Sequence, residues 1–161
     1  MSIYVITGGT TGIGAATREK LQEQGHEVFN IDYKGGDYTA DLSTKEGRKG
    51  AIEAVYQRYP DGIDCFINNA GVGPTVPAAT LFSLKIHLLN YFAATELAEG
   101  LQPLLKKKRG NCVMTASNSI TFPYVRQDWV DMLTNIHDED SFTQIAQGIP
   151  PQAGPACYST S

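Results

Sequence analysis

Residues 7–14 of the chain read TGGTTGIG, and they follow directly after the apolar run Ile3–Ile6. The run is mostly β-branched or aromatic, which is typical of a buried strand. Residues 13–24 have helical composition and are followed by Gly25, a common helix end. The glycines are therefore predicted to lie where a strand turns into a helix.

This glycine turn has properties that suit a phosphate group. Gly8, Gly12 and Gly14 carry no Cβ, so the backbone can turn tightly and approach a ligand closely. The following helix would add free N–H groups and the positive end of its dipole. Because the fingerprint G-x-G-x-x-G is not met in this stretch, the prediction depends on what surrounds the turn.

Asp32 supplies that context. It follows directly after a second predicted strand, residues 27–31, and stands 20 positions after Gly12 (32 − 12). A carboxylate there can accept hydrogen bonds from both ribose hydroxyls of NAD and would repel the 2′-phosphate of NADP. The sequence therefore predicts an NAD site; the alternative is a glycine turn beside a solvated aspartate.

Length and composition predict one globular domain over residues 1–161. The chain is 42% hydrophobic and 19% charged, as ordinary soluble proteins are. Its net charge of −4 gives no electrostatic reason to expect nucleic acid or an anionic membrane as a partner. The basic run at residues 106–109 precedes a glycine and fits the end of a helix.

The cysteines and histidines argue against disulfide and metal sites. Cys65, Cys112 and Cys157 are far apart, which favours a reducing compartment over a disulfide framework. The three histidines are isolated, so no metal site is expected. Neither a secretory leader nor a membrane-spanning apolar run is seen, and the expected location is the cytoplasm.

Strands and helices are predicted to alternate along the first 115 residues. Ser43 and Glu46 have the S-x-x-E spacing of a capping box, which predicts a helix start. The predicted strands are residues 3–6, 27–31, 38–40, 63–67 and 111–115, and the predicted helices are residues 13–24, about 43–59 and about 80–107. This rhythm predicts an α/β fold, a doubly wound parallel sheet of the Rossmann type with three layers.

Four polar or glycine positions follow the ends of predicted strands, namely Gly8, Asp32, Asp41 and Asn69. Ligands of such sheets bind beyond the carboxyl ends of the strands, so these positions are expected to converge on one site. After the last predicted strand the pattern changes, and residues 118–157 are interpreted as a helical insertion near the active site. Its large apolar residues, Trp129, Met132, Leu133 and Phe142, are expected to line a broad apolar pocket.

These motifs together resemble the short-chain dehydrogenase/reductase family. The resemblance is carried by TGGTTGIG, Asp32, Asp41-Leu42, the sequence NNAG at 68–71, Asn90, Ser117 and Tyr158. Residues 40–48 (ADLSTKEGR) and 90–97 (NYFAATEL) resemble the bacterial 3-alpha-hydroxysteroid dehydrogenase/carbonyl reductase branch. The 41 positions between Ser117 and Tyr158 (158 − 117) also fit that branch.

The resemblance implies NAD as the cofactor and a small-molecule alcohol or ketone as the substrate. The residues that it places against the cofactor are Gly8, Thr10, Thr11, Gly12, Ile13, Gly14, Asp32, Tyr33, Asp41, Leu42, Asn69, Ala70, Gly71 and Tyr158. It also implies a homodimer or homotetramer for the full-length protein, with no nucleic acid or membrane partner.

The resemblance also implies a catalytic set. Tyr158 would act as the general acid/base, Ser117 would hydrogen-bond the substrate oxygen, and Asn90 would position a water. The family's lysine, four residues beyond the tyrosine, would fall after Ser161. The sheet is therefore expected to be incomplete on its C-terminal side, and the 161-residue chain is expected to be inactive.

Three functions stay open at this point. The first is an NAD(H)-dependent oxidoreductase that interconverts a secondary alcohol and a ketone, on a steroid-like or another bulky carbonyl. The second is a catalytically inactive nucleotide-binding or interaction module of the same fold. The third, a 3-oxoacyl reductase, is disfavoured by Asp32 and by the insertion.

Overall fold

The computed structural model describes residues 1–73, 80–121, 125–136, 138–146 and 158, without the side chains of residues 80–83 and 120. The chain packs as two compact units. The first comprises residues 1–70 and 93–115, and the second comprises residues 71–92 and 116–161. The first unit holds the sheet, and the second includes the predicted insertion at residues 118–157.

The first unit is built on a five-stranded parallel sheet with the strand order β3-β2-β1-β4-β5. The strands are β1 (Ile3–Thr7), β2 (Glu27–Asp32), β3 (Tyr38–Thr39), β4 (Cys65–Asn68) and β5 (Asn111–Met114). Val5, Ile6, Ile31 and Phe66 are fully buried, as expected where both faces of a parallel sheet are covered. The predicted Rossmann-type fold is confirmed.

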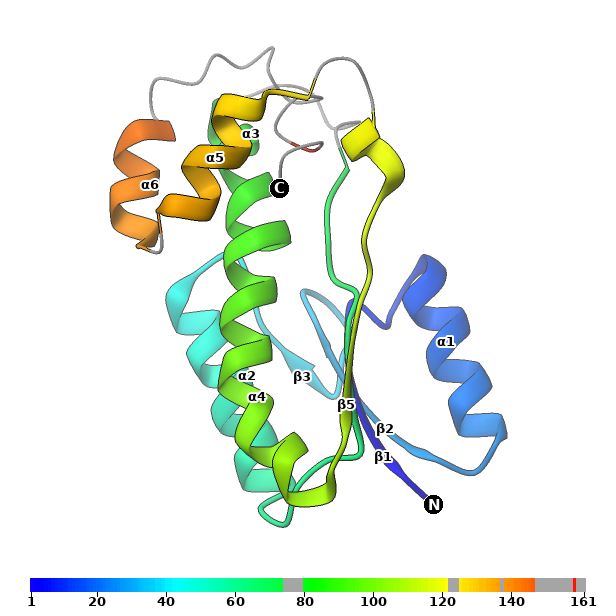
Figure 1. Ribbon diagram of the computed structural model, residues 1–161. Coiled ribbons are helices and arrows are strands. Elements are labelled where there is room, and N and C mark those ends of the chain that lie inside the picture. The colour runs from blue at the N-terminus through cyan, green and yellow to red at the C-terminus, as the bar shows by residue number, and fades with distance from the viewer. Residues whose placement is uncertain (74–79, 122–124, 137, 147–157, 159–161) are drawn as a thin grey trace. The chain divides into compact units, whose positions relative to one another are not determined.

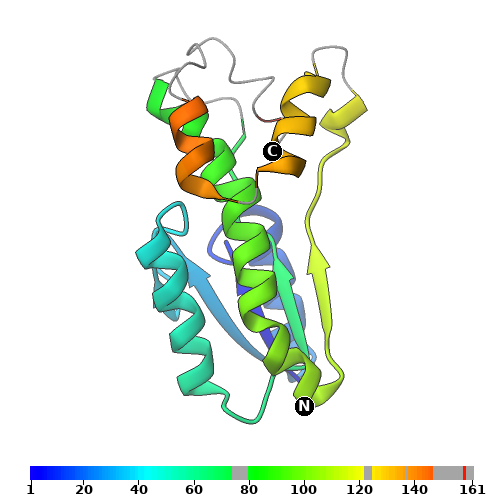
Figure 2. The same ribbon diagram turned by 60° about the vertical axis from the view of Figure 1, so that its left-hand side comes forward.

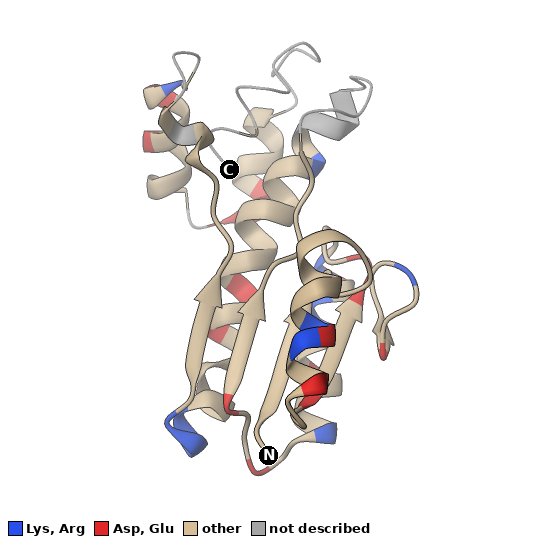
Figure 3. Cartoon of the chain, turned by 90° about the vertical axis from the view of Figure 1, so that its right-hand side faces the viewer, with Lys and Arg blue, Asp and Glu red and all other residues tan. Residues whose placement is uncertain are grey.

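Helices cover both faces of this sheet. Figure 1 shows α1 (Gly12–Glu23) on one face and α2 (Lys45–Arg58) with α4 (Ala94–Lys108) on the other. The 60° turn in Figure 2 shows α2 and α4 side by side in front of the strands. In Figure 3, basic and acidic residues are interspersed along α1, and the basic last turn of α4 lies where β5 begins.

The start of α2 differs in one detail from the prediction. The N-cap is Thr44, whose Oγ1 accepts the Gly47 N–H at 3.0 Å. The hydroxyl of Ser43 instead donates to the Asp41 carboxylate at 2.6 Å. The predicted capping box of Ser43 and Glu46 is therefore wrong, because the preceding turn already holds the serine hydroxyl.

A close approach of α2 to α4 is possible because position 100 is glycine. A Cβ at Gly100 would lie 2.5 Å from Ile52 Cδ1, so a larger residue would push the helices apart. The Tyr56 hydroxyl donates to the Gly100 carbonyl at 3.0 Å. These contacts fix α4, which precedes β5, against the helix that precedes β4.

A buried arginine joins the same two helices. Arg48 on α2 is fully buried, and its Nε and Nη2 donate to the two carboxylate oxygens of Glu96 on α4 at 2.5 and 3.2 Å. Its Nη1 donates to the Leu42 carbonyl at 3.2 Å. The guanidinium therefore ties α4 to the turn that leads into α2.

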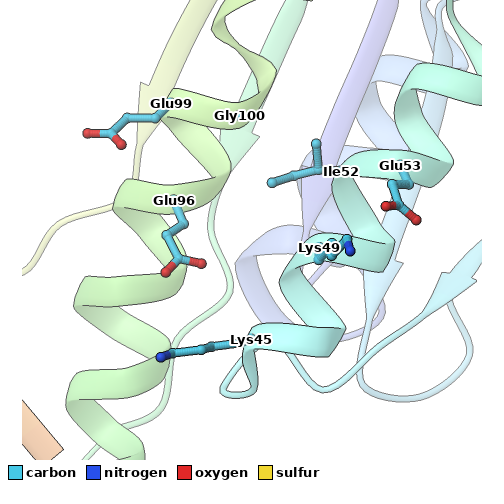
Figure 4. Close-up of a pocket in the computed structure, with 7 residues that line it drawn as sticks. All are labelled: Lys45, Lys49, Ile52, Glu53, Glu96, Glu99 and Gly100. Carbon is cyan, nitrogen blue, oxygen red and sulfur yellow. The ribbon is translucent and has the colours of Figure 1, made fainter. Parts of the chain in front are cut away.

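A groove with a volume of about 530 Å³ runs between α2 and α4. Figure 4 shows the side chains that line it; the full lining is Lys45, Lys49, Ile52, Glu53, Glu96, Glu99 and Gly100. Its walls carry charges of both signs. None of these residues belongs to the predicted cofactor or catalytic set.

The second unit contains α3 (Thr80–His87), a π-helical turn (Leu88–Ala93) that leads back to the first unit, a 3-10 turn (Asn118–Thr121), α5 (Gln127–Asn135) and α6 (Glu139–Ala146). Its buried core consists of Ile86, Phe92, Leu133, Phe142 and Ala146. The rings of Phe92 and Phe142 lie 5.3 Å apart between centroids. The predicted single helix over about 80–107 is therefore interrupted, at the predicted catalytic Asn90.

This core corrects one expectation about the insertion. Leu133 and Phe142 are buried among the other core side chains, so they stabilise the unit instead of lining a pocket. Trp129 and Met132 are partly buried against the same core. The Arg126 guanidinium lies 5.1 Å from the Trp129 ring centroid. Only these two of the four predicted lining residues still expose side-chain surface.

The strand β5 forms one edge of the sheet. All four of its residues are exposed, and Val113 and Met114 are each about half exposed. Exposed apolar side chains are unusual on the edge strand of a complete sheet. This agrees with the expectation of a sheet that is incomplete on its C-terminal side.

The described part of the chain contains neither a candidate membrane-spanning helix nor a candidate metal-binding cluster. No helix there combines the length and apolar character that a membrane crossing requires. Nor do three or more histidine, cysteine, aspartate or glutamate side chains gather there in a way that could hold a metal ion.

Asp64 is expected to make the fold sensitive to acid. Burial alone would raise its pKa, but the Ile3 N–H at 2.7 Å and the Lys108 ammonium at 3.3 Å outweigh it and lower the pKa. A lowered carboxylate pKa stabilises the folded state above the unfolded pKa of about 4, and this contribution disappears as the pH falls through the folded value.

Asp64→Asn should therefore lower the free energy of unfolding by about 1 kcal/mol at pH 7, because the site is partly exposed. The difference from the unmodified protein should narrow below about pH 4. Urea unfolding at a series of pH values measures both. A difference that stays constant down to pH 2 would show that the carboxylate charge contributes nothing.

Candidate functional site

The glycine turn connects β1 to α1. Its glycines allow positive φ angles, a close backbone contact and open space for a ligand. Gly8 and Gly12 have φ of +70° and +56°, which other residues rarely adopt. A Cβ at Gly14 would lie 2.1 Å from the Gly8 carbonyl oxygen and 2.6 Å from Asn69 Nδ2. A Cβ at Gly12 would meet nothing within 4 Å, so there is open space above that residue for a ligand.

The N-terminus of α1 fits the pyrophosphate of a dinucleotide. The N-cap Thr11 makes no side-chain capping hydrogen bond, and the first turn carries no acidic residue. The first N–H groups of an α-helix have no acceptor within the helix, and its dipole favours an anion there. The turn and helix therefore match the group that the sequence predicted.

The segment after β4 braces this turn. Thr7 Oγ1 accepts the N–H groups of Asn69 and Ala70 at 3.0 and 2.9 Å. The Asn69 side chain donates to the carbonyl groups of Thr7 and Gly8 at 3.1 and 3.2 Å. Sequence reasoning missed Thr7, whose only signal is a polar side chain at the end of an apolar strand. A direct contact of Asn69, Ala70 or Gly71 with a cofactor stays a prediction.

Asp32 stands at the end of β2, beside the turn. Its carboxylate accepts the Thr10 N–H at 3.0 Å and the Lys34 N–H at 3.3 Å. Two carboxylate oxygens offer about four lone-pair positions, so ribose hydroxyls can still bind. Ile13 and Tyr33 are large side chains left exposed beside the turn. The contact of both side chains with the cofactor stays a prediction.

Asp41 and Leu42 hold the turn that follows β3. The Asp41 carboxylate accepts the N–H of Ser43 at 3.0 Å as well as its hydroxyl, and the Leu42 side chain is buried. Their contacts with the cofactor stay a prediction. The hydrogen bonds fix the Asp41 side chain in the turn after β3, and burial fixes that of Leu42.

Asn90 lies within the π-helical turn of the second unit. Its Oδ1 accepts the Val72 N–H at 3.0 Å, and its Nδ2 donates to the Val72 carbonyl at 3.1 Å. Such local π turns frequently occur at functional sites. Both ends of the amide therefore hold the segment that follows the NNAG sequence, and the predicted role of Asn90 in placing a water stays a prediction.

Ser117 and Tyr158 also belong to the second unit. Ser117 is exposed just before the 3-10 turn, and its Oγ accepts the Ser119 N–H at 3.2 Å. Tyr158 is partly buried against the core of that unit. The predicted catalytic residues thus fall in one unit, whereas the predicted cofactor residues before position 71 fall in the other.

Comparisons with known proteins identify the family. The sequence model described as short chain dehydrogenase matches residues 2–128. The 3-alpha-hydroxysteroid dehydrogenase/carbonyl reductase of Comamonas testosteroni is 45% identical over 107 residues, covering 66% of this chain and 40% of that protein. The sorbitol-6-phosphate 2-dehydrogenase of Klebsiella pneumoniae is 36% identical over 81 residues, covering 44% of this chain and 30% of that protein.

Solved structures of this fold include relatives that cover nearly the whole chain. The 3-alpha-hydroxysteroid dehydrogenase from Pseudomonas sp. B-0831, complexed with NADH, gives a TM-score of 0.85 at 32% identity, covering 99% of this chain and 63% of that one. The chain thus spans less than two thirds of the length of these relatives. Because the family match runs from β1 through the glycine turn, Asp32 and Asn90 to the start of α5, the chain belongs to the short chain dehydrogenase family.

Proposed function

We propose that this chain forms the cofactor-binding part of an NAD(H)-dependent oxidoreductase that interconverts a secondary alcohol and a ketone. The observation that carries the proposal is the pairing of Asp32 with an uncapped helix N-terminus across one glycine turn. The helix end suits the pyrophosphate, and the carboxylate suits an unmodified ribose. The NADH bound to the Pseudomonas relative supports the same cofactor.

When bound, the cofactor supplies hydride transfer at its nicotinamide ring. The protein has to orient the substrate and handle the proton. Tyr158 would exchange the proton with the substrate oxygen as a general acid/base. Ser117 would donate a hydrogen bond to that oxygen where negative charge develops. Asn90 would place a water that connects the tyrosine to a lysine four positions further along.

The proposed substrate is a steroid-like or another bulky carbonyl compound. The support is the likeness to two proteins named as 3-alpha-hydroxysteroid dehydrogenases. Trp129 and Met132, which remain partly exposed on the second unit, would contribute apolar contacts to such a substrate. The full-length protein is proposed to be a cytoplasmic homodimer or homotetramer.

Asp32→Ala tests the cofactor choice. The unmodified protein should bind NAD(H) in preference to NADP(H), because a 2′-phosphate would face the carboxylate. The NAD affinity of the variant should fall about 10- to 100-fold, because this is the contribution that hydrogen bonds to a charged group make to binding. Its preference between the two cofactors should narrow at the same time. Calorimetric titration with both nucleotides measures these effects.

Asp61→Ala is the matched control, because Asp61 is exposed in the loop before β4. It should leave both affinities unchanged. Equal binding of NAD and NADP by the unmodified protein would contradict the proposed cofactor choice. Binding of NAD without any ketone reduction by the full-length protein would favour the alternative, an inactive nucleotide-binding module.

A further inference from the structure

Asn30 is a fully buried amide in the middle of β2, directly opposite Ile6 of β1. A buried amide without partners is costly, so its hydrogen bonds indicate what the position is for. Oδ1 accepts the Gly9 N–H at 2.8 Å, and Nδ2 donates to Thr10 Oγ1 at 3.1 Å. The side chain therefore reaches out of the sheet into the glycine turn.

Three consecutive residues of the turn are held by three consecutive residues of β2. The Gly8 N–H donates to the Ile31 carbonyl at 2.9 Å. The Gly9 N–H donates to Asn30, and the Thr10 N–H donates to the Asp32 carboxylate at 3.0 Å. The side chain of Asn30 thus holds the middle one of the three turn residues.

Thr10 connects this arrangement to the end of β2. Its hydroxyl accepts from Asn30 and donates to the Lys34 carbonyl at 3.1 Å. The Lys34 N–H in turn donates to the second oxygen of Asp32 at 3.3 Å. The Asn30 N–H donates to the Asp37 carboxylate at 2.8 Å. Asn30 and Asp32 are therefore held in one network together with the turn.

Gly9 fits the same network. A Cβ at Gly9 would lie 2.6 Å from Asn30 Oδ1 and 2.9 Å from its Cγ. Any larger residue at position 9 would displace the amide of Asn30. The position of the Asn30 amide therefore requires glycine at position 9, whether or not a ligand also requires it.

We propose that Asn30 is a positioning residue that holds the glycine turn and Asp32 in the geometry that receives the adenosine half of NAD(H). This inference rests on the proposed function. A turn that is ordered before binding does not have to be ordered by the cofactor, which raises affinity. Thr10 transmits the effect, because its hydroxyl lies between the Asn30 amide and the residues beside Asp32.

Asn30→Ala, Thr10→Val and the double variant test this in the complete 161-residue chain. Asn30→Ala should weaken NAD binding about 5- to 20-fold, because the loss of one or two hydrogen bonds costs a free energy that corresponds to this factor. The double variant should bind about as weakly as Asn30→Ala alone, because both changes break one network. Amide hydrogen exchange at Gly9 should quicken in Asn30→Ala without any ligand present.

Tyr59→Phe is the control for a purely structural effect. The Tyr59 hydroxyl donates to Glu27, at the other end of β2, at 2.8 Å. Burial, together with Glu27, raises the pKa of Tyr59 to about 12, so the phenol keeps its proton. Tyr59→Phe should lower the melting temperature and leave NAD affinity unchanged.

Two results would overturn the inference. One is an NAD affinity of Asn30→Ala equal to that of the unmodified chain. The other is an additive double variant, in which Thr10 acts independently of Asn30. If the unmodified chain binds no NAD(H), the proposed function fails instead. Amide hydrogen exchange at Gly9 then tests separately whether Asn30 holds the turn. Equal exchange rates in the unmodified chain and in Asn30→Ala would show that it does not.

Discussion

Glu96→Ala is expected to lower the free energy of unfolding by about 3–5 kcal/mol, although Glu96 is itself only partly buried. The reason lies in its partner. Arg48 is fully buried, and two of its nitrogens donate to the Glu96 carboxylate. Removing the carboxylate would leave a buried guanidinium without its counter-charge, which is far more costly than losing an exposed ion pair.

Glu99→Ala is the matched control, one helical turn further along α4. Figure 4 shows both glutamates on this helix, and Glu99 is exposed. Its replacement should change stability by no more than about 0.5 kcal/mol. Urea unfolding of the three proteins at neutral pH gives the comparison. Equal stability of the two variants would show that Arg48 finds a sufficient partner elsewhere, for example through the Leu42 carbonyl.

The sheet could be predicted from the sequence because its signals are local. Short β-branched runs such as Ile3–Ile6 end at glycine, aspartate or asparagine, and each predicted strand appears near the predicted residues. The right-handed rule for parallel strands then restricts the topology to few choices. The glycine turn and Asp32 follow from the same local pattern, so their places at the ends of β1 and β2 could be predicted as well.

The residues that brace the site could not be predicted, because their partners are distant in sequence. Thr7 receives hydrogen bonds from residues 62 and 63 positions away, and Asn30 from a residue 21 positions away. A polar residue within an apolar strand does not indicate which group it will meet. The cap of α2 was misplaced for a similar reason, since the choice between Ser43 and Thr44 depends on Asp41.

The second unit shows where periodicity stops being informative. Residues 118–157 were expected to be helical, and α5 and α6 are helices, but helical spacing cannot separate an apolar face that lines a pocket from one that packs on a neighbour. Leu133 and Phe142 turned out to pack in the core. The π-helical turn at Asn90 also escaped prediction, because one extra residue in a helical turn leaves no mark in the sequence pattern.

The largest effect is expected for catalysis. The 161-residue chain, assayed alone, should bind NADH but show no measurable ketone reduction. A phenol exchanges its proton readily near neutral pH only when a nearby cation stabilises the phenolate. The proposed mechanism takes this cation from a lysine four positions beyond Tyr158, and residues 1–161 do not include that position.

A longer chain that continues to a lysine four positions beyond Tyr158, and through the rest of the fold, should reduce ketones with NADH. In that protein Tyr158→Phe should lower kcat by about 10²- to 10⁴-fold, because it removes the group proposed to exchange the proton with the substrate oxygen. The variant should still bind NADH, since the glycine turn and Asp32 stay intact. Tyr56→Phe, which loses a hydroxyl bonded to Gly100 on α4, should keep its activity. Steady turnover that survives Tyr158→Phe would place the acid/base on another residue.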